Sequence, residues 1–239
     1  NALVNAPENL SDRLIELLSA SELGSQRAAI RLSTMLGGRR VAQALLPLLE
    51  NDTLRDEVVN AFCSQQDQFF SQLLTDQLLS EPMTRLFLVY LAGELRNTNS
   101  LQMVTESLDS ADPQLRYTAV ATLGKIGNEH SIAALVQCIN DENTDICDAV
   151  AGSLERLSAA YSAAIAATLI PLLDATDSGL RKRVVRVLGS IKGASVESAL
   201  LMALKDPESE VRCEAIRALR GCSVNTYTEG LKLALNDEV

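Results

Sequence analysis

Residues 112–124 have the sequence DPQLRYTAVATLG, and two later segments of the chain follow the same pattern. They are DSGLRKRVVRVLG at residues 177–189 and DPESEVRCEAIRAL at residues 206–219. In each segment an aspartate precedes an arginine, and apolar residues then recur every three or four positions. Such spacing places the apolar residues on one face of a helix, and an aspartate just before the first turn is a typical N-cap. Each segment therefore predicts an amphipathic helix that begins at its aspartate.

The arginine of these segments recurs along most of the chain, at intervals of 28, 30, 31, 65 and 31 residues. The positions are Arg27, Arg55, Arg85, Arg116, Arg181 and Arg212. The 65-residue interval is a double step, and Cys147 stands where the missing arginine would be. A period near 31 residues with two apolar segments per unit is typical of an α-solenoid, in which stacked helix pairs share one core. The predicted fold is all-α, a right-handed solenoid of about seven helix pairs plus a terminal unpaired helix.

The period divides the chain into units that should each hold a helix A, a short turn and a helix B. Their approximate bounds are 11–38, 41–66, 67–97, 98–127, 129–158, 160–192 and 194–223, with a partial unit at 225–239. We expect these units to form a single repeat domain over residues 1–239. The partial unit aligns with a helix A that no helix B follows, which predicts a fragment of a longer protein with further domains fused outside it. A lone helix that caps the solenoid is the alternative.

The composition argues against several classes of protein. Hydrophobic residues make up 47% of the chain and aromatic residues only 3%, so Leu, Ala, Val and Ile should form the core. The net charge of −10 argues against binding of nucleic acid or of an anionic membrane, because both need clustered Lys and Arg. No apolar run approaches the roughly 20 residues of a membrane span. Five cysteines without a CxxC pair suit a reducing compartment, and we expect a cytoplasmic protein.

The sequence contains no motif that predicts catalysis, a metal site or a cofactor. His130 is the only histidine, which argues against both a metal site and a nucleophile–base pair. The segment Gly37-Gly38-Arg39-Arg40 lacks the spacing of a phosphate-binding loop and predicts a turn between helices. We therefore expect a protein that is not an enzyme and that holds neither cofactor nor metal.

The unit resembles the HEAT repeat, especially its bacterial HEAT-like type. The family pattern is an apolar helix A ending in Leu-x-Asp, an Asp-Pro turn, Val-Arg and an alanine-rich helix B. Here it stands as Leu204-Lys205-Asp206-Pro207, Val211-Arg212 and Ala215 to Leu219. The resemblance covers roughly residues 11–237 and implies a scaffold that holds a protein partner in its concave groove. Two alternatives stay open, an enzyme of the phycobilin-lyase type and an enzyme that acts on DNA bases.

The resemblance also implies a structural role for the six recurring arginines, named here the arginine ladder. In such repeats the arginine pairs with an acidic residue at the turn between helices A and B of the same or the next unit. The candidates are Asp52, Glu81, Asp109, Asp141, Asp174 and Asp206. A bidentate guanidinium–carboxylate bond can fix neighbouring turns to each other. Because Cys147 replaces one arginine, we expect a weaker junction there.

Helices B line the concave surface of a solenoid, so partner contacts are expected on their outward positions. These positions lie about two, five and nine residues after each ladder arginine, and the side chains there that could anchor a partner are Phe87, Tyr90, Arg156, Arg183 and Arg186. Ala121, Ala149 and Gly152 predict a smooth floor between them. Such a groove suits an acidic amphipathic helix or an extended peptide. In the alternative, Phe87 and Tyr90 pack between repeats and the arginines are solvated.

Overall fold

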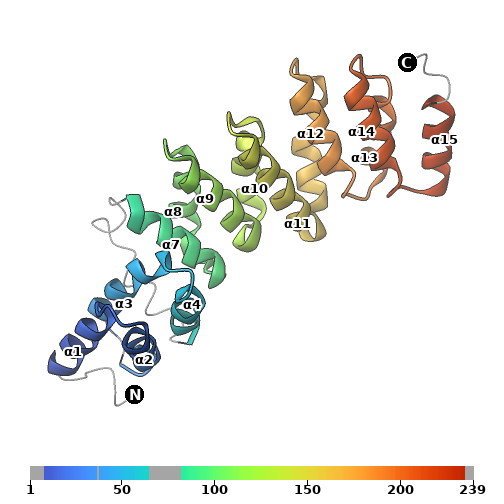
Figure 1. Ribbon diagram of the computed structural model, residues 1–239. Helices are drawn as coiled ribbons and strands as arrows, with labels where there is room; N and C mark the ends of the chain where they lie inside the picture. The colour runs from blue at the N-terminus through green and yellow to red at the C-terminus, as the bar shows by residue number, and fades with distance from the viewer. Residues whose placement is uncertain (1–7, 37, 65–81, 235–239) are drawn as a thin grey trace. The chain divides into compact units, whose positions relative to one another are not determined.

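The computed structural model describes residues 8–36, 38–64 and 82–234. Every regular element in these residues is a helix, which confirms the all-α class and the helical repeat (Figure 1). The chain divides into two compact units, Asn1–Ser100 and Leu101–Val239. The single repeat domain over the whole chain stays a prediction.

The first unit contains two helix pairs and helix B of a third. Its elements are α1 (Glu8–Leu18), α2 (Leu23–Ser33), α3 (Arg39–Leu45), the 3-10 helix η1 (Leu46–Glu50), α4 (Arg55–Ser64), α7 (Pro82–Glu94) and η2 (Thr98–Ser100). Helix α1 packs on α2 and α3, and α2 packs on α4. Leu18, Ile30, Leu45 and Phe62 are fully buried in this packing. The predicted helix A of the third pair falls largely in residues 65–81, outside the described residues.

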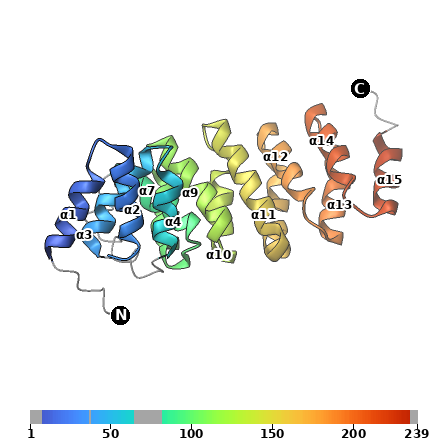
Figure 2. The same ribbon diagram turned by 60° about the horizontal axis from the view of Figure 1, so that its bottom comes forward.

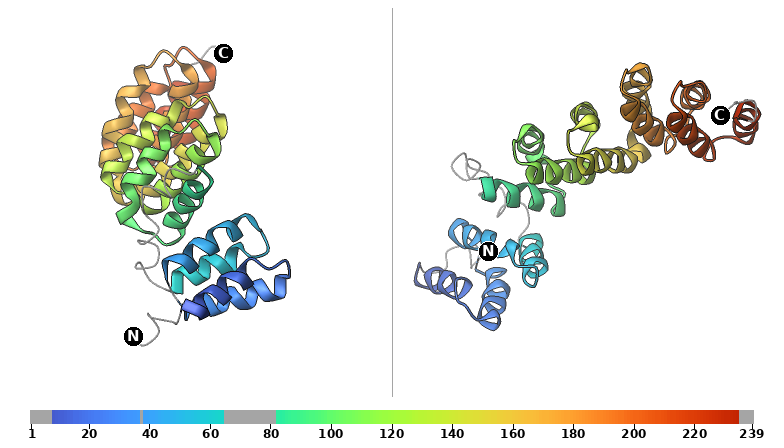
Figure 3. Two further views of the ribbon diagram at one scale, coloured as in Figure 1. Left: turned by 90° about the vertical axis from the view of Figure 1, so that its left-hand side faces the viewer. Right: turned by 45° about the horizontal axis from the view of Figure 1, so that its top comes forward.

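The second unit contains four successive helix pairs and one further helix, which follow one another in a row (Figures 2 and 3). Its elements are α8 (Leu101–Glu106), η3 (Ser107–Asp109), α9 (Pro113–Ile126), α10 (Glu129–Gln137), η4 (Cys138–Asn140), α11 (Thr144–Leu169), η5 (Ile170–Asp174), α12 (Ser178–Leu188), α13 (Ala194–Ala203), α14 (Ser209–Leu219) and α15 (Val224–Ala234). Helices B pack on one another, α9 on α11 and α12 on both α11 and α14.

Helix A ends in a 3-10 turn in four of the described repeats, at η1, η3, η4 and η5. Pro47 and Pro171 lie in the first turn of η1 and η5. Proline has no N–H to continue the α-helical hydrogen bonds, so these helices tighten there instead of continuing as α-helix. The residue after each of the four turns has extended backbone dihedrals, and the chain then turns toward helix B.

Helix α11 joins helix B of one repeat to helix A of the next. Its dihedrals leave the helical region at Tyr161, where φ is −126° and ψ is 31°, so the two halves meet at a kink. The segment Thr144–Asp174 is long and apolar enough to cross a membrane by length and composition, and an 18-residue window within it has a mean hydropathy of 1.5. Both halves pack on neighbouring repeats and bury Val150, Leu154 and Leu169, and 22% of the apolar window is buried.

Small residues let helices B of neighbouring repeats approach closely. A Cβ atom added at Gly124 of α9 would lie 2.5 Å from Oγ of Ser153 in α11. One added at Gly189, at the end of α12, would lie 2.7 Å from Cβ and 2.9 Å from Cα of Ala218 in α14. The hydroxyl of Ser153 is fully buried and donates a hydrogen bond to the carbonyl oxygen of Val120 at 3.0 Å. These contacts set the distance between successive helices B.

Two of the three expected N-caps are present. The carboxylates of Asp112 and Asp177 accept hydrogen bonds from the backbone N–H groups that begin α9 and α12. The expectation that the third helix begins at Asp206 is wrong, because α14 begins at Ser209. Asp206 lies six residues before its ladder arginine, whereas Asp112 lies four before its own, so the two aspartates do not occupy equivalent positions.

We predict that alanine has opposite effects on the free energy of unfolding when it replaces Gly189 and when it replaces Gly152. Gly189→Ala should lower the free energy of unfolding by about 1–3 kcal/mol, because the new methyl group meets the backbone of Ala218. Gly152→Ala should raise it by about 0.5–1 kcal/mol, since alanine is the better helix former. A Cβ at Gly152 would have only Nη1 of Arg156, at 3.9 Å, in its surroundings. Urea unfolding of both variants measures the two effects, and equal signs would contradict the close approach at Gly189.

Candidate functional site

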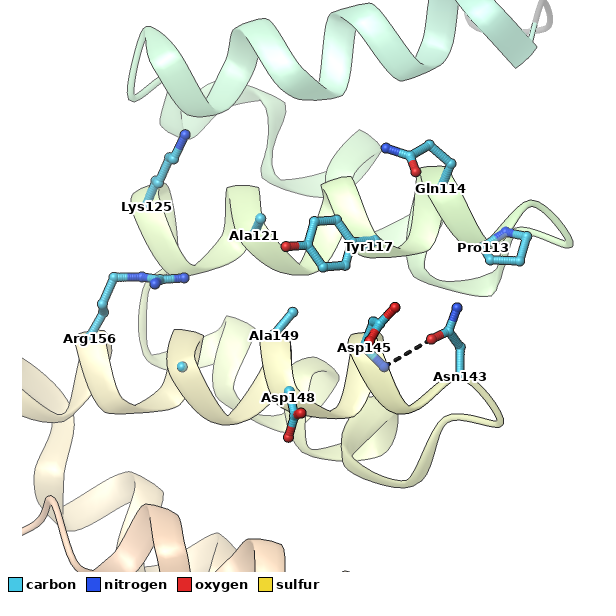
Figure 4. A pocket seen from close by; sticks show the side chains of 11 residues that line it. Pro113, Gln114, Tyr117, Ala121, Lys125, Asn143, Asp145, Asp148, Ala149 and Arg156 are labelled. Atoms are coloured by element: carbon cyan, nitrogen blue, oxygen red, sulfur yellow. Dashed lines mark hydrogen bonds between the residues drawn. The ribbon is translucent and has the colours of Figure 1, made fainter.

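A cavity of about 820 Å³ lies along helices B of two neighbouring repeats, α9 and α11 (Figure 4). We name it the α9–α11 groove. Its lining is Pro113, Gln114, Tyr117, Ala121 and Lys125 from α9 and Asn143, Asp145, Asp148, Ala149, Gly152 and Arg156 from α11 and the turn before it. All of these residues belong to the second unit.

The floor of the groove is formed by small side chains. Ala121 on α9 and Ala149 and Gly152 on α11 face the cavity, as the sequence predicts. The two helices are held close at Gly124 and Ser153 on their buried sides, so these small outward residues leave a hollow above them. Tyr117 lies beside this floor with 43% of its surface exposed.

Charged side chains of opposite sign lie at the two ends of the groove (Figure 4). Lys125 and Arg156 lie toward the C-terminal ends of the helices B, and Asp145 and Asp148 lie toward their N-terminal ends. The Nη2 atom of Arg156 donates to the hydroxyl of Ser153 at 3.0 Å. Within the described residues Arg156 and Asp145 form no ion pair, whereas Asp148 pairs with Arg186 at 2.9 Å. The groove therefore has a positive end and a negative end.

Of the predicted anchors, the structure places only Arg156 in the α9–α11 groove. Arg183 is engaged elsewhere, since its Nε atom donates to the carbonyl oxygen of Ile139 at 2.9 Å and its Nη2 atom donates to the side-chain oxygen of Asn140. Its side chain is only 22% exposed. Together with the Arg186–Asp148 pair, this contact corrects the picture of an open cationic patch, because both guanidinium groups already have partners within the protein.

Phe87 and Tyr90, the predicted aromatic anchors, lie in α7 of the first unit and are both half-buried. Phe87 borders a cavity of about 240 Å³ that is also lined by Pro47 and Met83, so its ring faces helix A of the preceding repeat. Burial and the nearby carboxylate of Glu94 raise the pKa of Tyr90. Their role as anchors stays a prediction.

Among the groove residues that the outward offsets do not include are Tyr117, Asp145 and Asp148. Tyr117 and Asp148 lie one residue after a ladder position, and Asp145 lies two residues before one. The predicted outward positions were two, five and nine residues after it. One helical residue corresponds to about 100° of rotation, so a groove that is bordered by two helices takes side chains from a wider arc than one stripe. Adding the positions four residues before the first two offsets, about one helical turn earlier, would have found all three.

Two rungs of the arginine ladder form bidentate pairs with the next repeat. Arg116 donates to both carboxylate oxygens of Asp141 at 2.9 and 3.0 Å, and Arg181 donates to those of Asp206 at 2.7 and 2.8 Å. The side chains of Arg116 and Asp141 are 10% and 11% exposed. Hydrogen bonds from Arg116 lower the pKa of Asp141, although burial opposes this shift. Nη1 of each arginine also donates to two backbone carbonyls of the turn before its own helix.

The other rungs form different contacts, and only the pair of Arg55 with Asp52 in the same repeat follows the predicted pattern among those described. Arg27 pairs with Glu57 on α4 at 2.9 Å, so the candidate Asp52 is not its partner. Asp52 instead pairs with Arg55 of its own repeat at 2.7 Å. Arg212 donates to the carbonyl oxygens of Asp206 and Pro207. The candidate Glu81 lies outside the described residues, and the pairing of Arg85 with Asp109 stays a prediction.

The missing rung is replaced by a different arginine. The thiol of Cys147 takes over one backbone contact and donates to the carbonyl oxygen of Asp141 at 3.1 Å. In the next repeat Ala175 holds the position of Asp141 and Asp206, and the candidate Asp174 before it is exposed and forms no ion pair among the described residues. Arg183 reaches back from α12 to the turn at η4 and ties the same two repeats together. The expected weak junction thus carries compensating bonds.

No group of three or more His, Cys, Asp or Glu side chains in the described part of the chain could hold a metal ion. His130 is exposed at the start of α10. Burial raises the pKa of the Cys138 thiol to about 11. It also raises the pKa of Cys147, so both thiols stay protonated near neutral pH.

A family model described as HEAT repeats matches residues 71–155 and 166–238. No curated protein matches the chain. Among solved structures, an engineered protein is 18% identical over 98% of this chain and 75% of that one, with a TM-score of 0.47. The complex of CpcE and CpcF of phycocyanin lyase from Nostoc sp. PCC7120 is 17% identical over 96% and 95% of the two chains, with a TM-score of 0.42.

A designed armadillo repeat protein in complex with the peptide (KR)4 is 16% identical over 87% of this chain and 98% of that one, with a TM-score of 0.40. At such identities and TM-scores, these likenesses concern the helical-repeat fold and carry nothing about a partner or an activity.

We predict that Arg116 and Asp141 stabilise the fold as a pair. Arg116→Ala should lower the free energy of unfolding at pH 7 by roughly 1–3 kcal/mol, because it leaves a mostly buried carboxylate without its donors. The pKa of Asp141 is lowered in the folded state, so its contribution is complete above the unfolded value of about 3.9 and is lost as the pH falls through the folded pKa. The difference between wild type and variant should therefore shrink in acid. Urea unfolding between pH 3 and pH 7 measures it.

The matched control is the carboxylate that has no arginine. Asp141→Asn should destabilise the protein, whereas Asp174→Asn should change the free energy of unfolding by less than about 0.5 kcal/mol. Equal effects of the two substitutions would show that the guanidinium pair does not matter.

Proposed function

We propose that this chain, which belongs to the HEAT-repeat family, is a non-catalytic scaffold that binds a protein partner through the α9–α11 groove. The groove is the observation that carries the proposal. Its volume of about 820 Å³ lies within the roughly 300–1,000 Å³ of typical ligand pockets. It is also far larger than the hollow beside Phe87 in the first unit.

The side chains in the groove are of the kinds that anchor protein contacts. Tyrosine and arginine contribute a large share of the binding energy at protein interfaces, and here Tyr117 and Arg156 are exposed on either side of a small-residue floor. Ala121, Ala149 and Gly152 present little side-chain volume, so an approaching segment can come close to the helix backbones. A peptide segment therefore gains apolar contact on the floor and charge contacts at the ends.

The lining gives less support to an enzyme. The residues that border the groove include no histidine, cysteine, serine or threonine, so they form no nucleophile–base pair. Asp145 and Asp148 are both exposed, whereas general acid–base work needs carboxylates in a shaped pocket that is partly shielded from water. An open groove with a polar rim fits recognition better than chemistry.

We predict that filling the groove abolishes partner recognition. Peptides that bind the chain are first selected from a random display library. Their dissociation constants are then measured with wild type, with Ala149→Arg and with Ala133→Arg. Ala149 faces the groove, whereas Ala133 is an exposed alanine of α10 outside its lining. We expect Ala149→Arg to weaken binding by about tenfold or more and Ala133→Arg to have little effect.

Tyr117→Ala provides a second variant that does not depend on tolerance of a larger side chain. Because Tyr117 is exposed, its removal should leave the melting temperature nearly unchanged while weakening the same peptides. Selected peptides that bind all variants equally, or a library that yields no binder, would refute the groove as the partner site. Tight binding of a linear tetrapyrrole that Ala149→Arg removes would favour the lyase alternative instead.

A further inference from the structure

Gly152 occupies a position that the fold does not explain. Glycine inside a helix is less favourable than alanine, and it is retained where another group must pack closely against the backbone. Gly124 has such a reason, since Ser153 of the neighbouring helix fills the place of its Cβ atom. A Cβ atom on Gly152 would meet nothing nearer than Nη1 of Arg156 at 3.9 Å. The space above Gly152 is open and belongs to the α9–α11 groove, so its packing partner is not part of this chain's described residues.

The charges of the groove fit a segment with two different ends. Asp145 and Arg156 lie eleven residues apart on α11, which corresponds to about 16 Å along the helix axis. Neither side chain has an ionic partner among the described residues, as shown above. A complementary segment places a carboxylate over Arg156 and Lys125 and a cation over Asp145. A segment with only one sign of charge would face repulsion at one end.

The floor of the groove favours a helical segment over an extended one. Ala121, Ala149 and Gly152 offer no side-chain donor or acceptor, and the backbone groups beneath them are used within α9 and α11. An extended peptide on this floor would leave its own N–H and C=O groups unpaired on that side. A helix satisfies its backbone internally and buries only side chains. The partner helix also needs small side chains on the face that lies against Gly152.

We propose that the partner segment is an α-helix that lies along the α9–α11 groove, with an acidic residue at Arg156 and Lys125, a basic residue at Asp145 and a small residue over Gly152. Residues eleven positions apart return to one helix face after about three turns, so one stripe of the partner carries all three contacts. The inference rests on the proposed function, because it names the chemistry of that same site.

The helix dipole also sets the direction of the partner helix. Acidic residues stabilise the first turn of a helix and basic residues its last turn. A partner helix with that arrangement places its N-terminus at Arg156, near the C-terminal end of the helical half of α11 before Tyr161. The partner helix therefore runs antiparallel to α9 and α11.

The test uses labelled synthetic helices of equal length and apolar face. Each carries two charged residues eleven positions apart on one stripe with alanine between them: Glu then Lys, Glu then Glu, or Lys then Lys. A fourth peptide repeats the Glu–Lys sequence with a central proline. Fluorescence anisotropy gives the dissociation constant of each peptide with the full chain. We expect the Glu–Lys helix to bind roughly two- to fivefold more tightly than either single-sign helix, and the proline peptide to bind least.

Variants of the groove identify the contacts. Arg156→Glu should reverse the preference so that the Lys–Lys helix becomes the tightest binder. Gly152→Leu should weaken the Glu–Lys helix by roughly tenfold, whereas Ala133→Leu on α10 should not. Equal binding of the Glu–Glu and Glu–Lys helices, tighter binding of the proline peptide, or full affinity in Gly152→Leu would overturn the proposal. So would a lack of binding by all four peptides, and in that case the library selection would still decide the proposed function by itself.

Discussion

No helix pair of this chain can bury its apolar face alone, so the interface between repeats determines the structure. In the second unit two contacts fix that interface from different parts of helix B. The Arg116–Asp141 pair near the start of α9 ties it to the turn of the next repeat. The close approach of Gly124 and Ser153 near its end sets the helix separation. A guanidinium fork is directional and a glycine contact is short, so register and distance are both defined.

The α9–α11 groove follows from the same packing. The residues that bring the two helices together face the core, and Ser153 donates its hydrogen bond there. The opposite face has only Ala121, Ala149 and Gly152 to fill the space between the helices. Large outward side chains would close the hollow at no cost to the ladder. The repeat itself therefore does not require small residues at the floor of the groove. The hollow that they leave at this junction is not needed for the fold.

The repeat and its helices could be predicted from the sequence because their signals are local. The caps at Asp112 and Asp177 and the intervals between arginines depend on residues a few positions apart. The contacts of Arg183 could not be predicted in this way. Its partners Ile139 and Asn140 are 44 and 43 residues away, in the turn of the preceding repeat. The predicted outward positions were the same in every repeat, and this rule assigned Arg183 to the groove.

Arginines at equivalent outward positions thus form different contacts, which depend on the residues around each of them. Arg186 pairs with Asp148, so a cation that approaches Asp148 from the groove has to compete with a guanidinium already in place. Asp145, one turn earlier on α11, has no such competitor among the described residues. At the other end Arg156 donates to the hydroxyl of Ser153 and forms no ion pair with any residue that the structure describes. The attraction of the groove for a charged segment is therefore strongest between Asp145 and Arg156, on the single helix that also carries Gly152. A partner segment that contacts these positions, as proposed above, would not touch the Arg116–Asp141 pair, which lies outside the lining of the groove.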